Sequence, residues 1–297
     1  MKLIAFSLDG HQRRIGILHD NLVYDLRDLF VALAKQRDWP VLPVFDFADF
    51  FDAPTYANFD TLQAAYELSQ SQGVTTYELD RVKLLAPFAK GAKMIAIGRN
   101  YGAHARELGN ELPTEPMYFA KLASCVIAPG EPIVLPPESN RVDHEGELAV
   151  VLGKRLSKPK LLDEALAAVF GYTCANDVTA RDIQKAAAAK GQPWTRGKNY
   201  DTFCPIGPCI VTADSYDASA VDVRCRVNGE IKQDGNTRDF IFSVGTLLHY
   251  VSQHITLEPG DVLLTGTPEG VSPLSNGDIV EVSINGIGSL TNPVKAL

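Results

Sequence analysis

The sequence predicts an α+β protein that is mostly β. Short runs of β-branched and aromatic residues recur along the chain, and Pro, Gly or Asp-Gly pairs separate them. Segments with helical periodicity are fewer and stand between these runs. Asn228-Gly229 lies between two alternating runs and is a strong hairpin signal. Many strands with few helices favour closed or sandwiched sheets with helices at their margin.

The chain is long enough for one large domain or two modest ones, with 297 residues. We expect a small α/β domain over residues 1–88, because short strand-like runs are followed by helical segments around 28–37 and 59–71. A linker around residues 85–91, with Pro and Gly, ends this module. The larger domain is expected over residues 94–297.

Composition excludes several classes of function. The net charge of −8 argues against nucleic acid or an anionic membrane as a partner. The N-terminal segment is too soon interrupted by charge for a signal peptide, and no apolar stretch approaches a membrane span, so we expect a cytoplasmic protein. The five cysteines are odd in number and lack a C-x-x-C pair, which indicates buried free thiols.

The acidic stretch around Glu145 and Glu147 carries the candidate chemistry. An apolar run over residues 148–153 follows it and is typical of a buried strand, on which side chains two apart point the same way. Burying two carboxylates roughly 7 Å apart by Cα is costly unless a cation neutralises them. Asp177, where another apolar run gives way to a helical stretch, is the best third ligand. The sequence therefore predicts a site for a hard divalent metal.

Three further segments contain candidate site residues. His104 and Glu107 are neighbours on one helical face, where a carboxylate orients an imidazole as a general base, although an ordinary exposed pair is the alternative. Lys198 could bind a substrate carboxylate or enolate, the alternative being a surface lysine. The glycine-bracketed loop 264–270 could present N–H groups and a hydroxyl to an anion, but it lacks the ending of a Walker loop.

Together these motifs resemble the fumarylacetoacetate hydrolase family in order and relative spacing. The resemblance covers roughly residues 94–297, and five ordered motifs are far more specific than one. It implies the family's mixed β-roll, usually dimeric, so a homodimer is expected, and the N-terminal module resembles the small extra domain of longer members. The five motifs are Gly98-Arg99-Asn100-Tyr101 with His104 and Glu107; Glu145-Gly146-Glu147; Asn176-Asp177 through Asp182; Pro193-Trp194 with Lys198; and Leu264-Thr265-Gly266-Thr267-Pro268-Glu269-Gly270-Val271.

The resemblance implies three groups of site residues. The expected ligands of Mg²⁺ or Mn²⁺, with Ca²⁺ as a substitute in crystals, are Glu145, Glu147 and Asp177. The expected catalytic residues are His104 and Glu107, which resemble the histidine–glutamate dyad on the family's lid segment, and Lys198, which resembles a lysine that contacts substrate oxygen. The expected residues for the substrate's carboxylate end are Arg99, Gln184 and Thr267.

The function implied is a metal-dependent hydrolase, an acylpyruvase of aromatic catabolism, acting on a small 2-keto acid. It would cleave a C–C bond of an acylpyruvate or fumarylpyruvate and release pyruvate. The same metal site could instead decarboxylate an oxaloacetate-type 2-keto acid or isomerise a 2-hydroxyhepta-2,4-diene-1,7-dioate-type dienoate. A glycosidase built on Glu145 and Glu147 is disfavoured, because same-face positions on one strand do not flank a sugar ring. A non-catalytic β-rich module with a structural ion is the remaining alternative.

Overall fold

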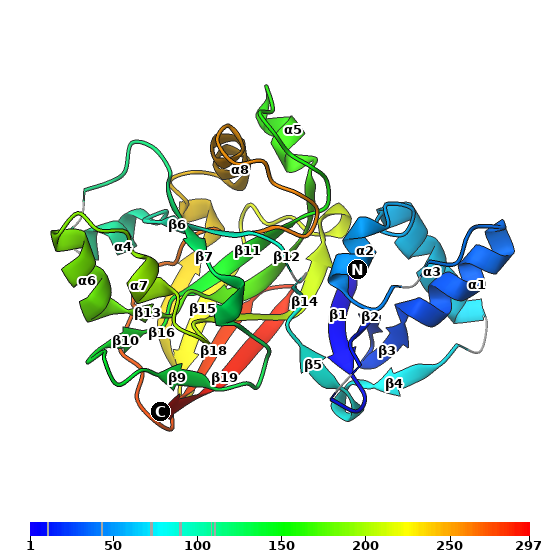
Figure 1. Ribbon diagram of the computed structural model, residues 1–297, viewed down its shortest axis with the longest axis horizontal. Helices are drawn as coiled ribbons and strands as arrows, with labels where there is room; N and C mark the ends of the chain where they lie inside the picture. Colours follow the sequence, from blue (N-terminus) through cyan, green and yellow to red (C-terminus); the bar gives the residue numbers. More distant parts are fainter. Residues whose placement is uncertain (11, 43, 72–73, 89–90, 108, 110) are drawn as a thin grey trace.

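The structure is a computed structural model that describes residues 1–297 except 11, 43, 72–73, 89–90, 108 and 110. Figure 1 shows a smaller N-terminal lobe beside a larger lobe. The elements of the smaller lobe are β1 (Lys2–Ser7), β2 (Arg14–His19), β3 (Leu22–Asp25), α1 (Leu26–Arg37), α2 (Phe47–Asp52), α3 (Phe59–Ser71), β4 (Thr76–Glu78), the 3₁₀ helix η1 (Leu79–Arg81) and β5 (Lys83–Leu85).

The larger lobe contains most of the strands. Its first part comprises β6 (Met94–Gly98), α4 (Gly102–Glu107), β7 (Met117–Lys121), η2 (Ala123–Cys125), β8 (Val126–Ile127), β9 (Ile133–Leu135), β10 (Val142–Asp143), β11 (Gly146–Leu152), α5 (Leu162–Leu166) and β12 (Val169–Asn176). Its second part comprises β13 (Thr179–Ala180), α6 (Arg181–Ala189), α7 (Thr195–Lys198), β14 (Cys204–Thr212), η3 (Ala213–Ser215), β15 (Asp222–Val227), β16 (Glu230–Asn236), η4 (Thr237–Asp239), α8 (Val244–Ser252), β17 (Val262–Leu264), β18 (Ile279–Ile284) and β19 (Gly288–Ala296).

These elements confirm the expected α+β, mostly β architecture. One sheet has the strand order β4-β3-β2-β1-β14-β12-β11-β17-β6-β7, and a second has the order β16-β15-β18-β19-β9. The second sheet contacts β11, β12 and β14 of the first, so two sheets enclose the core as a mixed β-roll. The hairpin predicted at Asn228-Gly229 joins β15 to β16, and both turn residues have positive φ, 52° and 83°.

The two lobes share one sheet and one core. Strand β1 pairs antiparallel with β14, so the first sheet runs across the expected boundary between residues 88 and 94. Phe50 of α2 packs edge-on against Phe170 of β12, with ring centroids 5.5 Å apart. Ala89 and Lys90 of the expected linker lie outside the described residues. The division into 1–88 and 94–297 as separate units stays a prediction.

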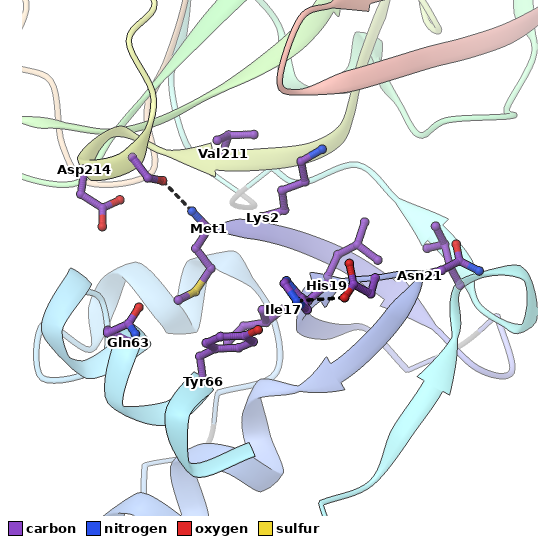
Figure 2. Close-up of a pocket in the computed structure, with 13 residues that line it drawn as sticks. Met1, Lys2, Ile17, His19, Asn21, Gln63, Tyr66, Val211 and Asp214 are labelled. Atoms are coloured by element: carbon purple, nitrogen blue, oxygen red, sulfur yellow. Dashed lines mark hydrogen bonds and ion pairs between the residues drawn. The ribbon is translucent and has the colours of Figure 1, made fainter. Parts of the chain in front are cut away.

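A cavity of about 570 Å³ lies between the lobes, against β1 and β14 (Figure 2). Lys2, His19, Tyr66 and Asp214 are among its lining residues, and His19 pairs with Asp20 at 3.2 Å. None of the nine site residues expected from the sequence is among the described residues that line it. We call it the interlobe cavity.

Two other expectations concern composition. All five cysteines are free and buried, as predicted. Within the described residues, no helix is both long and apolar enough to cross a membrane.

Strand register brings four chain segments to one end of β11. The start of β11 lies beside the end of β12, because the two are antiparallel and Gly146 pairs with Asn176. β17 is also antiparallel to β11, and β6 is parallel to β17. The C-terminal ends of β6 and β17 therefore lie at the edge of the sheet where β11 begins. The segments that follow β6, β12 and β17 therefore meet Glu145 and Glu147, and α4, α6 and α7 gather at this side of the larger lobe (Figure 1).

Candidate metal centre

Three carboxylates meet at the start of β11. Glu145, Glu147 and Asp177 each offer an oxygen, and these oxygens lie within 4.8 Å of one another. The three residues are 4%, 1% and 1% exposed. Carboxylate oxygens are the ligands that Mg²⁺ and Mn²⁺ prefer, so the donor set suits a hard divalent cation.

Backbone contacts hold the three acids in place. The N–H of Glu145 donates to the side-chain oxygen of Asn176 at 2.9 Å, and the N–H of Asp177 donates to the carbonyl of Glu145 at 2.9 Å. Gly146 separates the two glutamates, and a Cβ there would lie 3.2 Å from that of Cys225 in the second sheet. Glycine thus lets the second sheet pack closely beneath the acids.

Two buried cations neutralise Glu145. The Lys198 ammonium lies 2.7 Å from Glu145 Oε2 and 2.6 Å from Asp177 Oδ2. Arg181 donates to Glu145 and, at 2.8 Å, to Asp143. Burial alone would raise the pKa of Glu145, but the charges of Lys198 and Arg181 hold it well below its usual range. Glu145 is therefore ionised.

Glu147 is not neutralised in this way. It accepts a hydrogen bond from the Gly266 N–H at 2.7 Å, and among the described residues no cation forms an ion pair with it. Burial and the charges of Asp177 and Glu145 raise its pKa well above the usual value. Asp177 Oδ1 lies 2.8 Å from the Lys121 ammonium, yet it is a buried oxygen without an aligned hydrogen bond in the described structure. A divalent cation would satisfy both groups, so these residues fit such a metal.

A cavity of about 130 Å³ opens beside Glu145. Five of the expected site residues line it, together with four others. The lining residues are Arg99, His104, Glu145, Arg181, Gln184, Lys185, Ala188, Trp194 and Lys198. We call it the site cavity.

Thr267, expected at the substrate's carboxylate end, is not among the described residues that line the site cavity. Its hydroxyl is buried and donates to the Gly146 carbonyl at 2.8 Å, and it accepts from the Gln233 amide at 2.7 Å. Here the threonine braces the strand that carries the two glutamates.

The expected dyad forms on α4. His104 Nδ1 lies 3.3 Å from Glu107 Oε2, and the Gly270 N–H donates to Glu107 at 3.0 Å. Burial lowers the pKa of His104, against the opposing charge of Glu145 and the hydrogen bond to Glu107. We assign the proton of the neutral ring to Nδ1, because that atom faces the carboxylate, which leaves Nε2 as the acceptor.

Two buried cations of this site, Arg181 and Lys121, were not predicted from the sequence. Arg181 belongs to the motif that contains Asp177. Its position at the start of a helix does not indicate that it forms an ion pair with Glu145, which lies 36 residues earlier in the chain. Lys121 ends β7 as a lone lysine; its ammonium donates to the carbonyls of Lys198 and Phe203, the second at 2.9 Å. Only the folded chain shows that both face the acids.

A cluster of three buried carboxylates on a mixed β-roll is an arrangement suited to an enzyme that binds a divalent metal. Residues 93–295 match the family model described as the C-terminal domain of fumarylacetoacetate (FAA) hydrolase. This chain therefore belongs to the fumarylacetoacetate hydrolase family, as its motifs predicted.

Three relatives illustrate the range of reactions. The mitochondrial oxaloacetate tautomerase FAHD2A of Bos taurus is 45% identical over 221 residues, which cover 72% of this chain and 69% of the relative. The mitochondrial oxaloacetate decarboxylase of Dictyostelium discoideum is 47% identical over 198 residues, or 66% and 90% of the two chains. The solved maleylpyruvate hydrolase of Sphingobium sp. SYK-6, in complex with manganese(II) and pyruvate, is 31% identical with a TM-score of 0.78 and covers 100% and 99% of the chains.

Proposed function

We propose that this protein is a divalent-metal-dependent enzyme that interconverts the enol and keto forms of a small 2-oxo dicarboxylate of the oxaloacetate type. The observation that carries the proposal is the buried cluster of Glu145, Glu147 and Asp177, together with the cavity that Glu145 lines beside several cationic side chains. The sequence favoured hydrolysis of an acylpyruvate. An oxaloacetate tautomerase at 45% identity supports proton transfer as the first candidate instead, and an oxaloacetate decarboxylase at 47% identity supports the same kind of substrate.

Two cations of the site cavity support a substrate with a second carboxylate. Arg181 and Lys198 pair with acids, whereas Arg99 and Lys185 have no acidic partner among the described residues. Arg99 adopts the left-handed conformation, with φ 60°, and its guanidinium lies 5.8 Å from the centroid of the Trp194 ring. A non-glycine residue held in that region next to a site is a constraint typical of function. These two cations are suited to the distal carboxylate.

A metal held by Glu145, Glu147 and Asp177 would supply Lewis acidity toward the 2-oxo group and its neighbouring carboxylate. Lys198, buried in the wall of the site cavity, offers its ammonium to the oxygen that becomes negative when the C3 proton leaves. His104, neutral through burial, accepts the C3 proton at Nε2, and Glu107 stabilises the imidazolium that results. The oxygen takes a proton from solvent to complete the enol. In the reverse reaction the enol oxygen gives its proton to solvent and the imidazolium returns its proton to C3.

Hydrolysis of a C–C bond is the second candidate. The His104–Glu107 dyad favours it, because an oriented imidazole can take a proton from water as well as from carbon. A family neighbour solved with manganese(II) and pyruvate is a maleylpyruvate hydrolase. The two candidates differ in whether a water molecule must be activated.

One set of assays tests both candidates. Protein stripped with EDTA is reloaded with Mg²⁺ or Mn²⁺, and loss of the enol absorbance of oxaloacetate is followed. A coupled lactate dehydrogenase assay reports pyruvate from decarboxylation, while the absorbance of acetylpyruvate and fumarylpyruvate reports hydrolysis. We expect metal-dependent ketonisation of oxaloacetate, faster than with metal alone. If the loaded protein leaves the rate of ketonisation at the level of free metal, the first candidate is wrong.

The homodimer stays a prediction, which light scattering tests.

A further inference from the structure

We propose that Gln233 is a positioning residue for this site. It lies on β16 in the second sheet and is 1% exposed, and in the described part of the chain no hydrogen bond joins its side chain to any of the three acids. It acts through the loop over residues 265–272, which we call the site loop, and through the start of β11. The inference rests on the proposed metal site and extends it to a residue outside the family motifs on which the resemblance was based.

The amide of Gln233 joins two segments that carry site residues. Its Oε1 accepts from the Gly146 N–H at 2.9 Å and lies 3.0 Å from His144 Nδ1. Its Nε2 donates to Thr267 Oγ1 and to the Pro268 carbonyl, both at 2.7 Å. One buried side chain thus holds the strand of the two glutamates on one side and the site loop on the other.

The orientation of this amide follows from its partners. The Gly146 N–H can only donate, so the oxygen must face it, and the Pro268 carbonyl can only accept, so the nitrogen must face that group. His144 Nδ1 then carries a proton, and its Nε2 accepts from Ser272 Oγ at 2.9 Å. Each of these polar groups has a partner, and a satisfied buried network specifies one arrangement.

The site loop in turn contacts two of the site's acids through its backbone. The Gly266 N–H donates to Glu147 at 2.7 Å, and the Gly270 N–H donates to Glu107 at 3.0 Å. A shift of the loop would therefore move a donor of the metal ligand and a donor of the dyad together. Gln233 fixes the loop relative to β11 from the second sheet, in addition to the hydroxyls of Thr265 and Thr267, which donate to β11 carbonyls.

Close packing against β16 leaves the site loop little freedom to find another position. Gly270 has φ +95°, and a Cβ there would lie 1.9 Å from the Lys232 carbonyl oxygen. A Cβ on Gly235 would lie 2.4 Å from that of Pro268. The loop backbone packs directly on the strand that carries Gln233. When the amide is lost, the loop therefore has little room to find new hydrogen-bond partners for the Thr267 hydroxyl and the Pro268 carbonyl.

A purely structural role is the competing explanation, and Asn292 provides the matched control. It is also a buried amide, 1% exposed, and its nitrogen donates to the Ala128 and Glu131 carbonyls at 2.8 Å each. It lies on β19, and its two hydrogen-bond partners belong neither to the site loop nor to the acidic cluster, so Asn292→Ala removes two buried hydrogen bonds without touching the site loop. Both Asn292→Ala and Gln233→Ala should lower the melting temperature.

The test compares Mn²⁺ affinity by calorimetry on EDTA-stripped protein, with kcat and KM for enol oxaloacetate as the second measurement. We expect Gln233→Ala to weaken Mn²⁺ binding about 10-fold and to lower kcat about 10- to 100-fold with KM within about threefold, the range for outer-shell partners. Asn292→Ala should leave both unchanged. Mn²⁺ affinity and kcat of Gln233→Ala that match those of Asn292→Ala would overturn the proposal.

Gln233→Glu keeps the test decisive where Gln233→Ala does not fold. It retains an oxygen for the Gly146 N–H but removes the donors to Thr267 and Pro268. We expect weaker Mn²⁺ binding and lower kcat here too, and unchanged values would count against the role of the loop. Failure of the wild-type protein to bind Mn²⁺ would instead reject the proposed function, so the two failures are distinguishable.

Discussion

The smaller of the two cavities, and not the larger, contains the buried charged side chains. The interlobe cavity measures about 570 Å³ and the site cavity about 130 Å³. Charges in the larger one are exposed: the side chains of its His19–Asp20 pair are 50% and 87% accessible. Three charged side chains that line the smaller one are buried: those of Glu145, Arg181 and Lys198 are 6%, 3% and 3% accessible. Because exposed charges are hydrated at little cost whereas buried ones need partners, the balance of buried charge identifies the site better than volume does.

A substitution of a metal ligand should have the largest effect, and it should distinguish the site cavity from the interlobe cavity most clearly. We expect Asp177→Asn to lower Mn²⁺ affinity and kcat by more than about 100-fold, the upper end for outer-shell partners, since the negative charge of a direct ligand is lost. Calorimetry and the enol assay measure this. Asp214→Asn in the interlobe cavity is the control and should leave both values unchanged. Equal Mn²⁺ affinity in the two variants would place the metal elsewhere.

Removing the imidazole should have the next largest effect. We expect His104→Ala to lower kcat for ketonisation about 10²- to 10⁴-fold, because a general base is lost, while Mn²⁺ affinity changes little. His19→Ala, a histidine of the interlobe cavity, should leave kcat unchanged. Comparable activity of His104→Ala and wild-type protein would remove the dyad from the mechanism.

Removing a cation at the mouth of the site cavity should change recognition of the substrate. We expect Lys185→Ala to raise KM for oxaloacetate about tenfold, the cost of one charge-assisted hydrogen bond, and to leave kcat largely unchanged. KM for acetylpyruvate, which lacks the second carboxylate, should not change. Lys190→Ala, also exposed just beyond α6, is the control. A parallel rise in KM for both substrates would argue against a subsite for the distal carboxylate.

The smallest effect concerns pH. Burial lowers the pKa of His104 below the usual 6.5, so the neutral base persists at lower pH than an exposed histidine allows. We expect the acid limb of kcat/KM to lie below pH 6.5 and activity to fall as pH drops through the lowered pKa. The free energy of unfolding should change in the same direction. The contribution of His104 is fully present above pH 6.5 and is lost as the pH falls through the lowered pKa of the folded state, because protonating the buried ring is unfavourable. Profiles of kcat/KM and of melting temperature against pH measure both.

Several features of the site could be predicted from the sequence. Glu145 and Glu147 are two apart, and an extended backbone places two such residues on one face. In the structure Glu145 immediately precedes β11, Glu147 is its second residue, and oxygens of the two carboxylates lie within 4.8 Å of each other. The helices over 28–37 and 59–71 and the hairpin at Asn228-Gly229 also follow from local periodicity and turn chemistry. α2 was missed because six residues give too short a period to recognise.

The sequence by itself determined the acids, the likeness to a family and the local elements, because each depends on residues close together in the chain. Only the tertiary structure decided which cations face the acids, where the cavity opens and which amide fixes the site loop. Lys121, Arg181 and Gln233 are single polar residues without periodic neighbours, so nothing local indicates their partners. The antiparallel register of β11 with β12 and β17 brings those partners together, and register is a property of the folded sheet.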